Sequence, residues 1–176
     1  MREPTSLKTQ PITDLMKELK DYGEETFRFD HSHPFLFLMH CPDFEPHDLE
    51  VDTLAGEPIK PSLSRRELLK GQVVVLEKRD PQEFRKELTV GRSSRNDIVI
   101  RSPRISKVHA KFLLAEEDGY RLEDLGSTNG TVLNGLPQKP NKPAALNNGD
   151  VVSFWRYTFE YMELGFVLSL LTPRQR

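Results

Sequence analysis

The sequence is poor in features that would mark a secreted or membrane protein. It has one cysteine, Cys41, in 176 residues, so it cannot form an internal disulfide framework, and a reducing compartment is the ordinary setting for such a chain. The apolar stretch at residues 165–171 is far too short to cross a bilayer. The polar first fifteen residues lack the apolar core of a signal peptide. We therefore expect a cytoplasmic protein with no membrane partner.

The sequence also lacks a strong excess of charge of either sign. The formal net charge is −2, which argues against a general nucleic-acid binder. The charges are nevertheless uneven, because acids predominate before residue 71 and Lys and Arg predominate after it. A locally basic second half is compatible with an anionic ligand.

We assign residues 1–70 to an N-terminal extension of helical and irregular structure. Apolar residues at i, i+3, i+4 and i+7 predict a short helix at about 13–22, with Thr13 as its N-cap and Gly23 as its stop. An apolar run at about 34–40 predicts a strand, and a proline-rich acidic linker follows it. One short amphipathic helix cannot form a core alone, so we expect it to dock elsewhere.

From residue 71 the pattern changes to short β-type runs separated by turn signals such as Asp-Gly and Asn-Gly. Many short strands at this spacing, without helical periodicity between them, predict an all-β fold, a sandwich or a barrel. We assign residues 71–165 to this β domain and residues 166–176 to a C-terminal tail.

Three segments of the β domain carry residue types that strand formation does not require. They read GRSSRNDIVI at 91–100, RISKVHA at 104–110 and DLGSTNGTVLNG at 124–135. Phosphate needs several convergent donors, which arginine, hydroxyls and the backbone N–H groups of turns provide. Glycine lets the backbone turn or approach where a Cβ would clash. Together the segments indicate an oxyanion site.

The order Gly-Arg, Ser-x-x-His and Ser-Thr-Asn-Gly-Thr followed by Asn-Gly resembles the forkhead-associated (FHA) family, over roughly residues 72–163. The resemblance implies an FHA-type β-sandwich of short antiparallel strands that binds phosphothreonine peptides. From their positions in the motifs, the resemblance implies that some residues bind the phosphopeptide and that others support the shape of the site. The binding residues would be Arg92 and Ser106 for the phosphate, Lys107 for added charge, and Thr128 and Asn129 for the peptide; Gly91, His109 and Gly130 would support them.

The function that follows is a phosphothreonine-binding adaptor in Ser/Thr kinase signalling, with no catalysis and no cofactor. A hydrolase built on Ser106 and His109 is disfavoured because no Gly-x-Ser-x-Gly elbow surrounds the serine. An alternative is a scaffold module that keeps the fold and binds its partner without phosphorylation. A third reading, a metal-dependent catalytic segment in residues 1–70, is disfavoured because that segment is short.

The N-terminal part carries two further features. Four histidines and Cys41 lie between residues 31 and 47, but no zinc spacing is completed, so we expect no metal site. Thr5 and Thr9 lie near the N-terminus. Some small bacterial FHA proteins bind a phosphorylated threonine of their own tail, and this chain is similar in layout. The expected partners are therefore a phosphothreonine protein, a Ser/Thr kinase and this tail.

Overall fold

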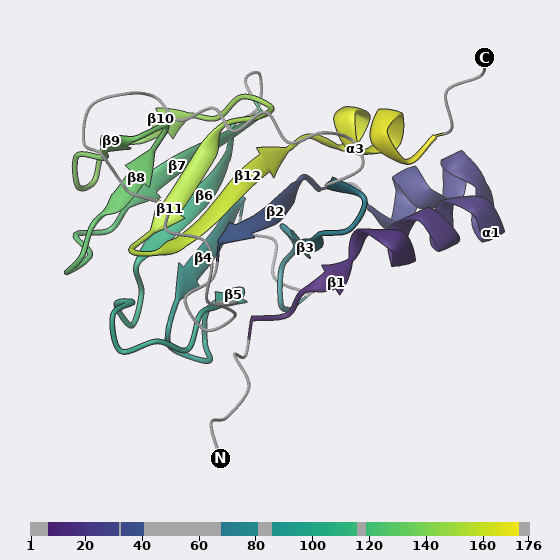
Figure 1. The fold of residues 1–176 in the computed structure, drawn as a ribbon. Helices are drawn as coiled ribbons and strands as arrows, with labels where there is room; N and C mark the ends of the chain where they lie inside the picture. The colour runs from purple at the N-terminus through teal and green to yellow at the C-terminus, as the bar shows by residue number, and fades with distance from the viewer. Residues whose placement is uncertain (1–6, 32, 41–67, 81–85, 116–118, 173–176) are drawn as a thin grey trace.

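The computed structural model describes residues 7–31, 33–40, 68–80, 86–115 and 119–172. Within these residues two sheets pack face to face as a β-sandwich (Figure 1). The first sheet has the order β1 (Gln10–Pro11), β3 (Gln72–Val75), β2 (Phe35–His40), β12 (Tyr157–Met162), β11 (Val151–Phe154), β8 (Thr131–Leu133) and β9 (Leu136–Pro137). The second has the order β10 (Ala144–Ala145), β7 (Gly119–Asp124), β6 (Ala110–Ala115), β4 (Glu87–Gly91) and β5 (Ile98–Val99), with β5 parallel to β4. The predicted all-β sandwich is confirmed.

The main core lies between the two sheets. In β12, buried Tyr157, Phe159 and Tyr161 alternate with partly exposed residues, as expected of a strand with one face inward. Phe112 of β6 packs edge-on against Phe154 of β11, which joins the sheets. Each fully buried aromatic ring contributes roughly 1.5–3 kcal/mol by leaving water. This core fixes the strand ends from which the three motif segments emerge.

Strand β2 lies inside the first sheet, between β3 and β12, where Phe35 pairs with both Val75 and Met162. Leu36 contributes to the core between the sheets, whereas Phe35 and Phe37 contribute to a second apolar cluster. A strand covered on both faces is apolar throughout, which explains the uninterrupted run at 34–40. The segment predicted as an N-terminal extension therefore supplies a central strand of the first sheet. The predicted domain boundaries, at residues 70/71 and 165/166, remain a proposal.

Two helices cover the second cluster at one end of the molecule (Figure 1). Helix α1 spans Ile12–Asp30, longer than the predicted 13–22, and its helical geometry is interrupted at Gly23, where φ is 82°. Helix α3 spans Leu164–Leu171, where the sequence predicted only a tail, and buries Val167 and Leu171. None of the helices in the described part of the chain is both long and apolar enough to span a membrane.

Two histidines of the N-terminal part, His31 and His33, form separate contacts. His31 Nε2 lies 2.7 Å from Glu18 Oε2 across the break in α1, and His33 Nδ1 lies 3.0 Å from the Tyr120 hydroxyl of β7. No group of three or more potential metal ligands occurs among the described residues. Cys41 and His47, like the linker after β2, lie outside the residues that the structure describes.

Candidate functional site

Three loops emerge side by side because three adjacent strands end together. In the second sheet Val90 of β4 pairs with Ala110 of β6, and Ala110 pairs with Asp124 of β7. The loops that follow β4, precede β6 and follow β7 therefore begin at neighbouring positions. These are the loops that carry the three sequence motifs, so the topology alone brings the motifs to one end of the sandwich.

Backbone contacts join the first loop to the second. The N–H of Arg92 donates to the Ser106 carbonyl oxygen at 2.9 Å, and that of Ser93 donates to Lys107 O at 3.2 Å. Gly91 sits at this junction, and a Cβ on it would lie 2.5 Å from Lys107 O. The glycine is thus required by close backbone approach rather than by an unusual φ. The backbone hydrogen bonds and this close approach therefore hold the segments that contain Arg92 and Ser106 side by side.

The buried imidazole of His109 joins the second loop to the third. Its Nδ1 accepts from the Ser106 backbone N–H at 3.2 Å, so Nε2 carries the proton and donates to Gly130 O at 3.1 Å. Burial lowers the pKa of His109, against the opposing effects of the Gly130 hydrogen bond and the Asp124 charge. Since backbone groups occupy both ring nitrogens, His109 is not placed to activate the Ser106 hydroxyl as a base.

Hydroxyl and amide groups of the third loop lie against the second. The Thr128 N–H donates to Ser106 Oγ at 3.1 Å, and the two hydroxyl oxygens are 3.4 Å apart. Asn129 Nδ2 donates to the Arg104 carbonyl oxygen at 2.6 Å. Thr128 and Asn129 are exposed and Ser106 is half-buried. The structure therefore brings together the hydroxyl and amide groups predicted from the second and third motifs.

The third loop is shaped by Asp124, which the sequence prediction did not single out. Its carboxylate accepts hydrogen bonds from Gly126 N (2.9 Å), Ser127 N (3.0 Å), Ser127 Oγ (2.6 Å) and Thr131 Oγ1 (2.6 Å). Burial acts to raise the pKa of Asp124, but the bonds from Ser127 and Thr131 hold it below its ordinary value. An aspartate two residues before a glycine is a known turn signal that would have found it.

Asn96 shapes the first loop as Asp124 shapes the third, and this role was not predicted from the sequence. Its buried side chain donates from Nδ2 to Ser93 O at 2.8 Å and to Lys107 O at 2.7 Å. It therefore fixes the turn that follows Arg92 and ties this turn to the second loop. Asparagine in a polar turn is common, and the sequence contained no sign that this one is buried.

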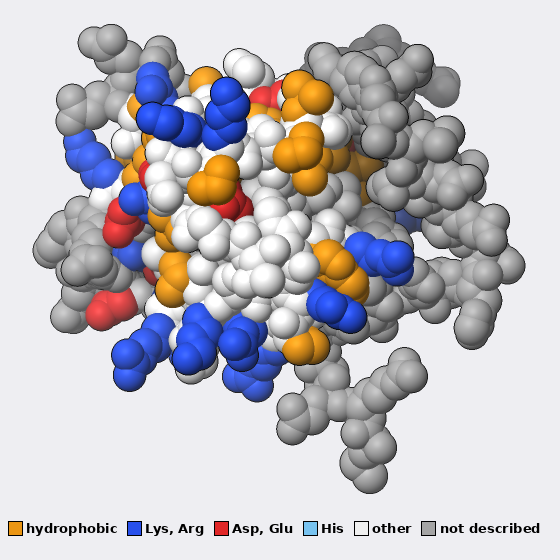
Figure 2. All heavy atoms as spheres, turned by 90° about the vertical axis from the view of Figure 1, so that its left-hand side faces the viewer, with side chains coloured by type: hydrophobic (Ala, Val, Ile, Leu, Met, Phe, Trp, Pro, Cys, Tyr) orange, Lys and Arg blue, Asp and Glu red, His pale blue; other side chains and the backbone are white. Residues whose placement is uncertain are grey.

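The outer surface of these loops is basic. Arg92, Arg95, Arg104 and Lys107 are exposed. Figure 2 shows a group of Lys and Arg side chains along the lower edge of this face, at the height of the loops in Figure 1. The guanidinium of Arg104 also lies 5.9 Å from the ring centre of Trp155 in the β11–β12 turn. Cationic side chains beside exposed hydroxyl and amide donors form a surface suited to an anion.

Residues 88–155 match the family model described as FHA domain. An FHA domain-containing protein of Arabidopsis thaliana is 36% identical over 72 residues, which are 40% of this chain and 18% of that protein. Protein FraH of a Nostoc species is 45% identical over 49 residues, 28% of this chain and 17% of that protein. The chain thus spans less than a fifth of the length of either curated relative.

Among solved structures, the MEK1 FHA domain in complex with a HOP1 phosphothreonine peptide is 30% identical. The match covers 52% of this chain and 87% of that one, with a TM-score of 0.42. The fold is an FHA-type β-sandwich, a class that serves in phosphopeptide recognition and protein–protein interaction. The chain carries an FHA domain, with residues 88–155 matching the family model.

Proposed function

We propose that this protein binds phosphothreonine peptides through the three loops at the end of the sandwich, as an adaptor in Ser/Thr kinase signalling. The observation that carries the proposal is the contact between Ser106 and Thr128. It places two hydroxyls and a loop N–H within 3.4 Å of one another, next to the segment that begins at Arg92. A phosphate needs such a convergence of donors with a nearby positive charge.

Each predicted binding residue has a role in this proposal. Arg92 supplies a planar fork to a phosphate that carries about −1.5 to −2 charges at neutral pH. The Ser106 hydroxyl donates to a phosphate oxygen, and Lys107 adds charge beside it. Asn129 holds the peptide backbone while Thr128 lines the same loop. Gly91, His109 and Gly130 fix the spacing of the loops.

The protein in this proposal binds and does not catalyse. One phosphate and a few flanking side chains make a small interface, so binding is reversible and moderate in strength. The partners are phosphothreonine proteins of the cytoplasm, among them substrates or domains of a Ser/Thr kinase. The phosphorylation-independent scaffold remains the competing function, and the experiment described next separates the two.

The deciding experiment compares phosphorylated and unphosphorylated threonine peptide libraries on the wild-type protein and on Arg92→Ala. We expect binding only to the phosphorylated library, and a loss on the order of tenfold to a hundredfold in Arg92→Ala, because a charge-assisted contact disappears. Lys20→Ala on α1 serves as a charge-matched control. Equal binding to both libraries would favour the scaffold.

The N-terminal tail is a further candidate partner. Thr5 lies outside the described residues, and Thr9 immediately precedes β1, which is paired with β3. After kinase treatment, a phosphorylated tail that occupies the site should weaken binding of an added phosphopeptide. Unchanged affinity in the Thr5→Ala, Thr9→Ala double variant relative to the treated wild type would exclude this partner.

A further inference from the structure

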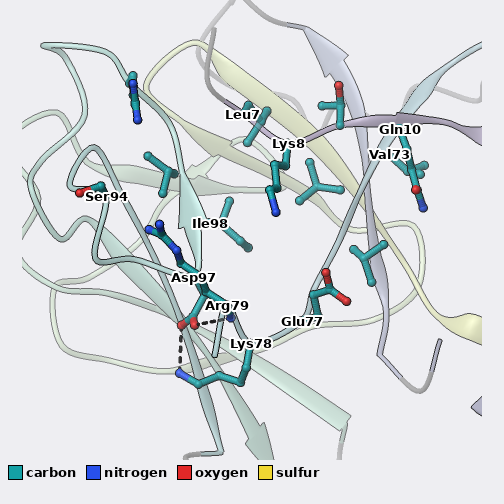
Figure 3. Close-up of a pocket in the computed structure, with 15 residues that line it drawn as sticks. Leu7, Lys8, Gln10, Val73, Glu77, Lys78, Arg79, Ser94, Asp97 and Ile98 are labelled. Carbon is teal, nitrogen blue, oxygen red and sulfur yellow. Dashed lines mark hydrogen bonds and ion pairs between the residues drawn. The ribbon is translucent and has the colours of Figure 1, made fainter. Parts of the chain in front are cut away.

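A groove of about 530 Å³ opens between the edges of the two sheets, next to the functional loops (Figure 3). Three segments contribute its lining residues, and these lie within 7–10, 73–79 and 94–101. No role described above uses this groove.

An edge strand of each sheet borders the groove. Strand β5 is one of the two edge strands of the second sheet, and its Ile98 and Val99 line the groove. In the first sheet β1 pairs with β3 only at Gln72 and Val73, so Val74 and Val75 extend past the pairing with β1. Short strand edges that lie at the limit of a sheet can accept an added extended peptide strand.

The groove combines an apolar floor with a cationic rim. Val75 and Ile98 supply apolar surface, while Lys8, Arg79 and Arg101 are exposed on its lining. Figure 3 shows Lys8 pointing into the groove and Asp97 held between Lys78 and the Arg79 backbone.

Two acidic residues also line the groove, and they neutralise only part of the positive charge on its rim. The Asp97 carboxylate is already engaged within the protein, because it accepts hydrogen bonds from Lys78 Nζ (3.1 Å), Arg79 N (3.1 Å) and Thr89 N (2.8 Å). Glu77 is the second acid that lines the groove. Three exposed cations around an apolar floor fit an extended segment in which acidic and apolar residues alternate.

The groove is continuous with the loops that we assign to the phosphate. Ser94 lines the groove two residues after Arg92, so their Cα atoms lie at most about 7.6 Å apart. Arg101 lines it from the segment that leads to Ser106. We infer that the groove binds an acidic, extended flank of the same peptide that carries the phosphothreonine. This inference rests on the proposed function and names a second determinant of its specificity.

The test uses the full chain and three kinds of phosphothreonine peptide. One is short, and the others extend it on either side by about six alternating acidic and apolar residues, a span of roughly 20 Å. We expect one extension to raise affinity at least fivefold. The Lys8→Ala, Arg101→Ala double variant should lose that gain and bind the short peptide as the wild type does, whereas Lys20→Ala should keep it.

Two outcomes would overturn the inference while leaving the proposed function intact. In one, the short peptide binds and neither extension adds affinity; in the other, the gain survives in the double variant. A short peptide that fails to bind would instead reject the proposed function, and the inference with it. Amide exchange adds a direct readout, because only the effective extended peptide should slow exchange within residues 74–75 and 98–99.

Discussion

The imidazole of His109 bridges two backbone groups that are 24 residues apart in sequence: Nδ1 accepts from the N–H of Ser106 and Nε2 donates to the carbonyl of Gly130. The ring is fully buried and meets Phe154 edge-on at 5.6 Å between ring centres. It therefore connects the core to two of the three loops that carry the sequence motifs, and its loss should disturb stability and the candidate site together.

Replacing His109 tests this coupling. His109→Ala leaves two partly buried backbone groups without this partner and empties a buried site, and we expect it to lower the free energy of unfolding by about 2–4 kcal/mol. His109→Gln keeps an amide near the Nε2 position and should lose less. Urea unfolding measures both variants, and an Ala variant as stable as the Gln variant would contradict the role of the Gly130 contact.

The same histidine predicts a pH dependence. Burial holds the pKa of His109 below the ordinary 6.5, so the unfolded chain takes up the proton more readily than the folded one. Its contribution to stability is therefore complete above about pH 6.5 and is lost as pH falls from there toward the folded pKa. Between pH 7.5 and 5.5 the wild type should lose more stability in urea unfolding than His109→Gln. Parallel pH profiles for the two proteins would refute this assignment.

The strand pattern was sufficient to predict an all-β fold, because alternation along segments such as β12 depends only on local sequence; the resemblance to the FHA family selected the sandwich over a barrel. It was not sufficient to place β2. Pairing of Phe35 with Val75 and Met162 joins residues far apart in the chain, and nothing in a local pattern encodes such a partner. Helix α3 was missed because its eight residues carry no polar face or capping signal that distinguishes a helix from an apolar tail.

Gly91 gives a prediction with a matched control. Gly91→Ala places a Cβ 2.5 Å from Lys107 O, a backbone atom that cannot move without separating the first two loops. We expect a loss of about 1–3 kcal/mol of stability and weaker phosphopeptide binding. Gly165→Ala meets nothing within 4 Å and lies in α3, so it should be neutral or slightly stabilising. Equal behaviour of the two variants in thermal unfolding would refute the close-approach argument.

The position of the motif residues in the candidate site could be predicted from the sequence, whereas two of the buried groups that shape its loops were not predicted. Ser106, Thr128 and Asn129 stand in recognisable Ser-x-x-His and Ser-Thr-Asn-Gly patterns. Asp124 and Asn96 instead act through hydrogen bonds to backbone groups. The turn signal at Asp124 is visible in the sequence, but the set of donors that its carboxylate binds, and the burial of Asn96, depend on the three-dimensional shape of the loops.

Asp124 is expected to be the most sensitive of these buried groups. Asp124→Asn replaces an acceptor of four hydrogen bonds with an amide whose nitrogen cannot accept from Ser127 Oγ and Thr131 Oγ1. We expect about 2–4 kcal/mol of lost stability and a disordered third loop in amide exchange. Ser153→Ala removes an ordinary hydroxyl contact with Thr158 on the sheet and is the control. A wild-type exchange pattern in residues 125–130 of Asp124→Asn would contradict the prediction.

Substitutions of Asn129 should change phosphopeptide affinity with little change in the stability of the fold. Its Nδ2 is anchored to Arg104 O at 2.6 Å, which fixes the amide plane, while the residue itself is exposed. Asn129→Ala should therefore change stability by less than about 1 kcal/mol and yet weaken phosphothreonine-peptide binding roughly tenfold. Asn129→Asp keeps the shape, loses the donor and places a negative charge in a site for phosphate, so its affinity should fall further. Calorimetric titration of both variants checks this order, and an Asp variant that binds as well as the Ala variant would place Asn129 away from the bound phosphate.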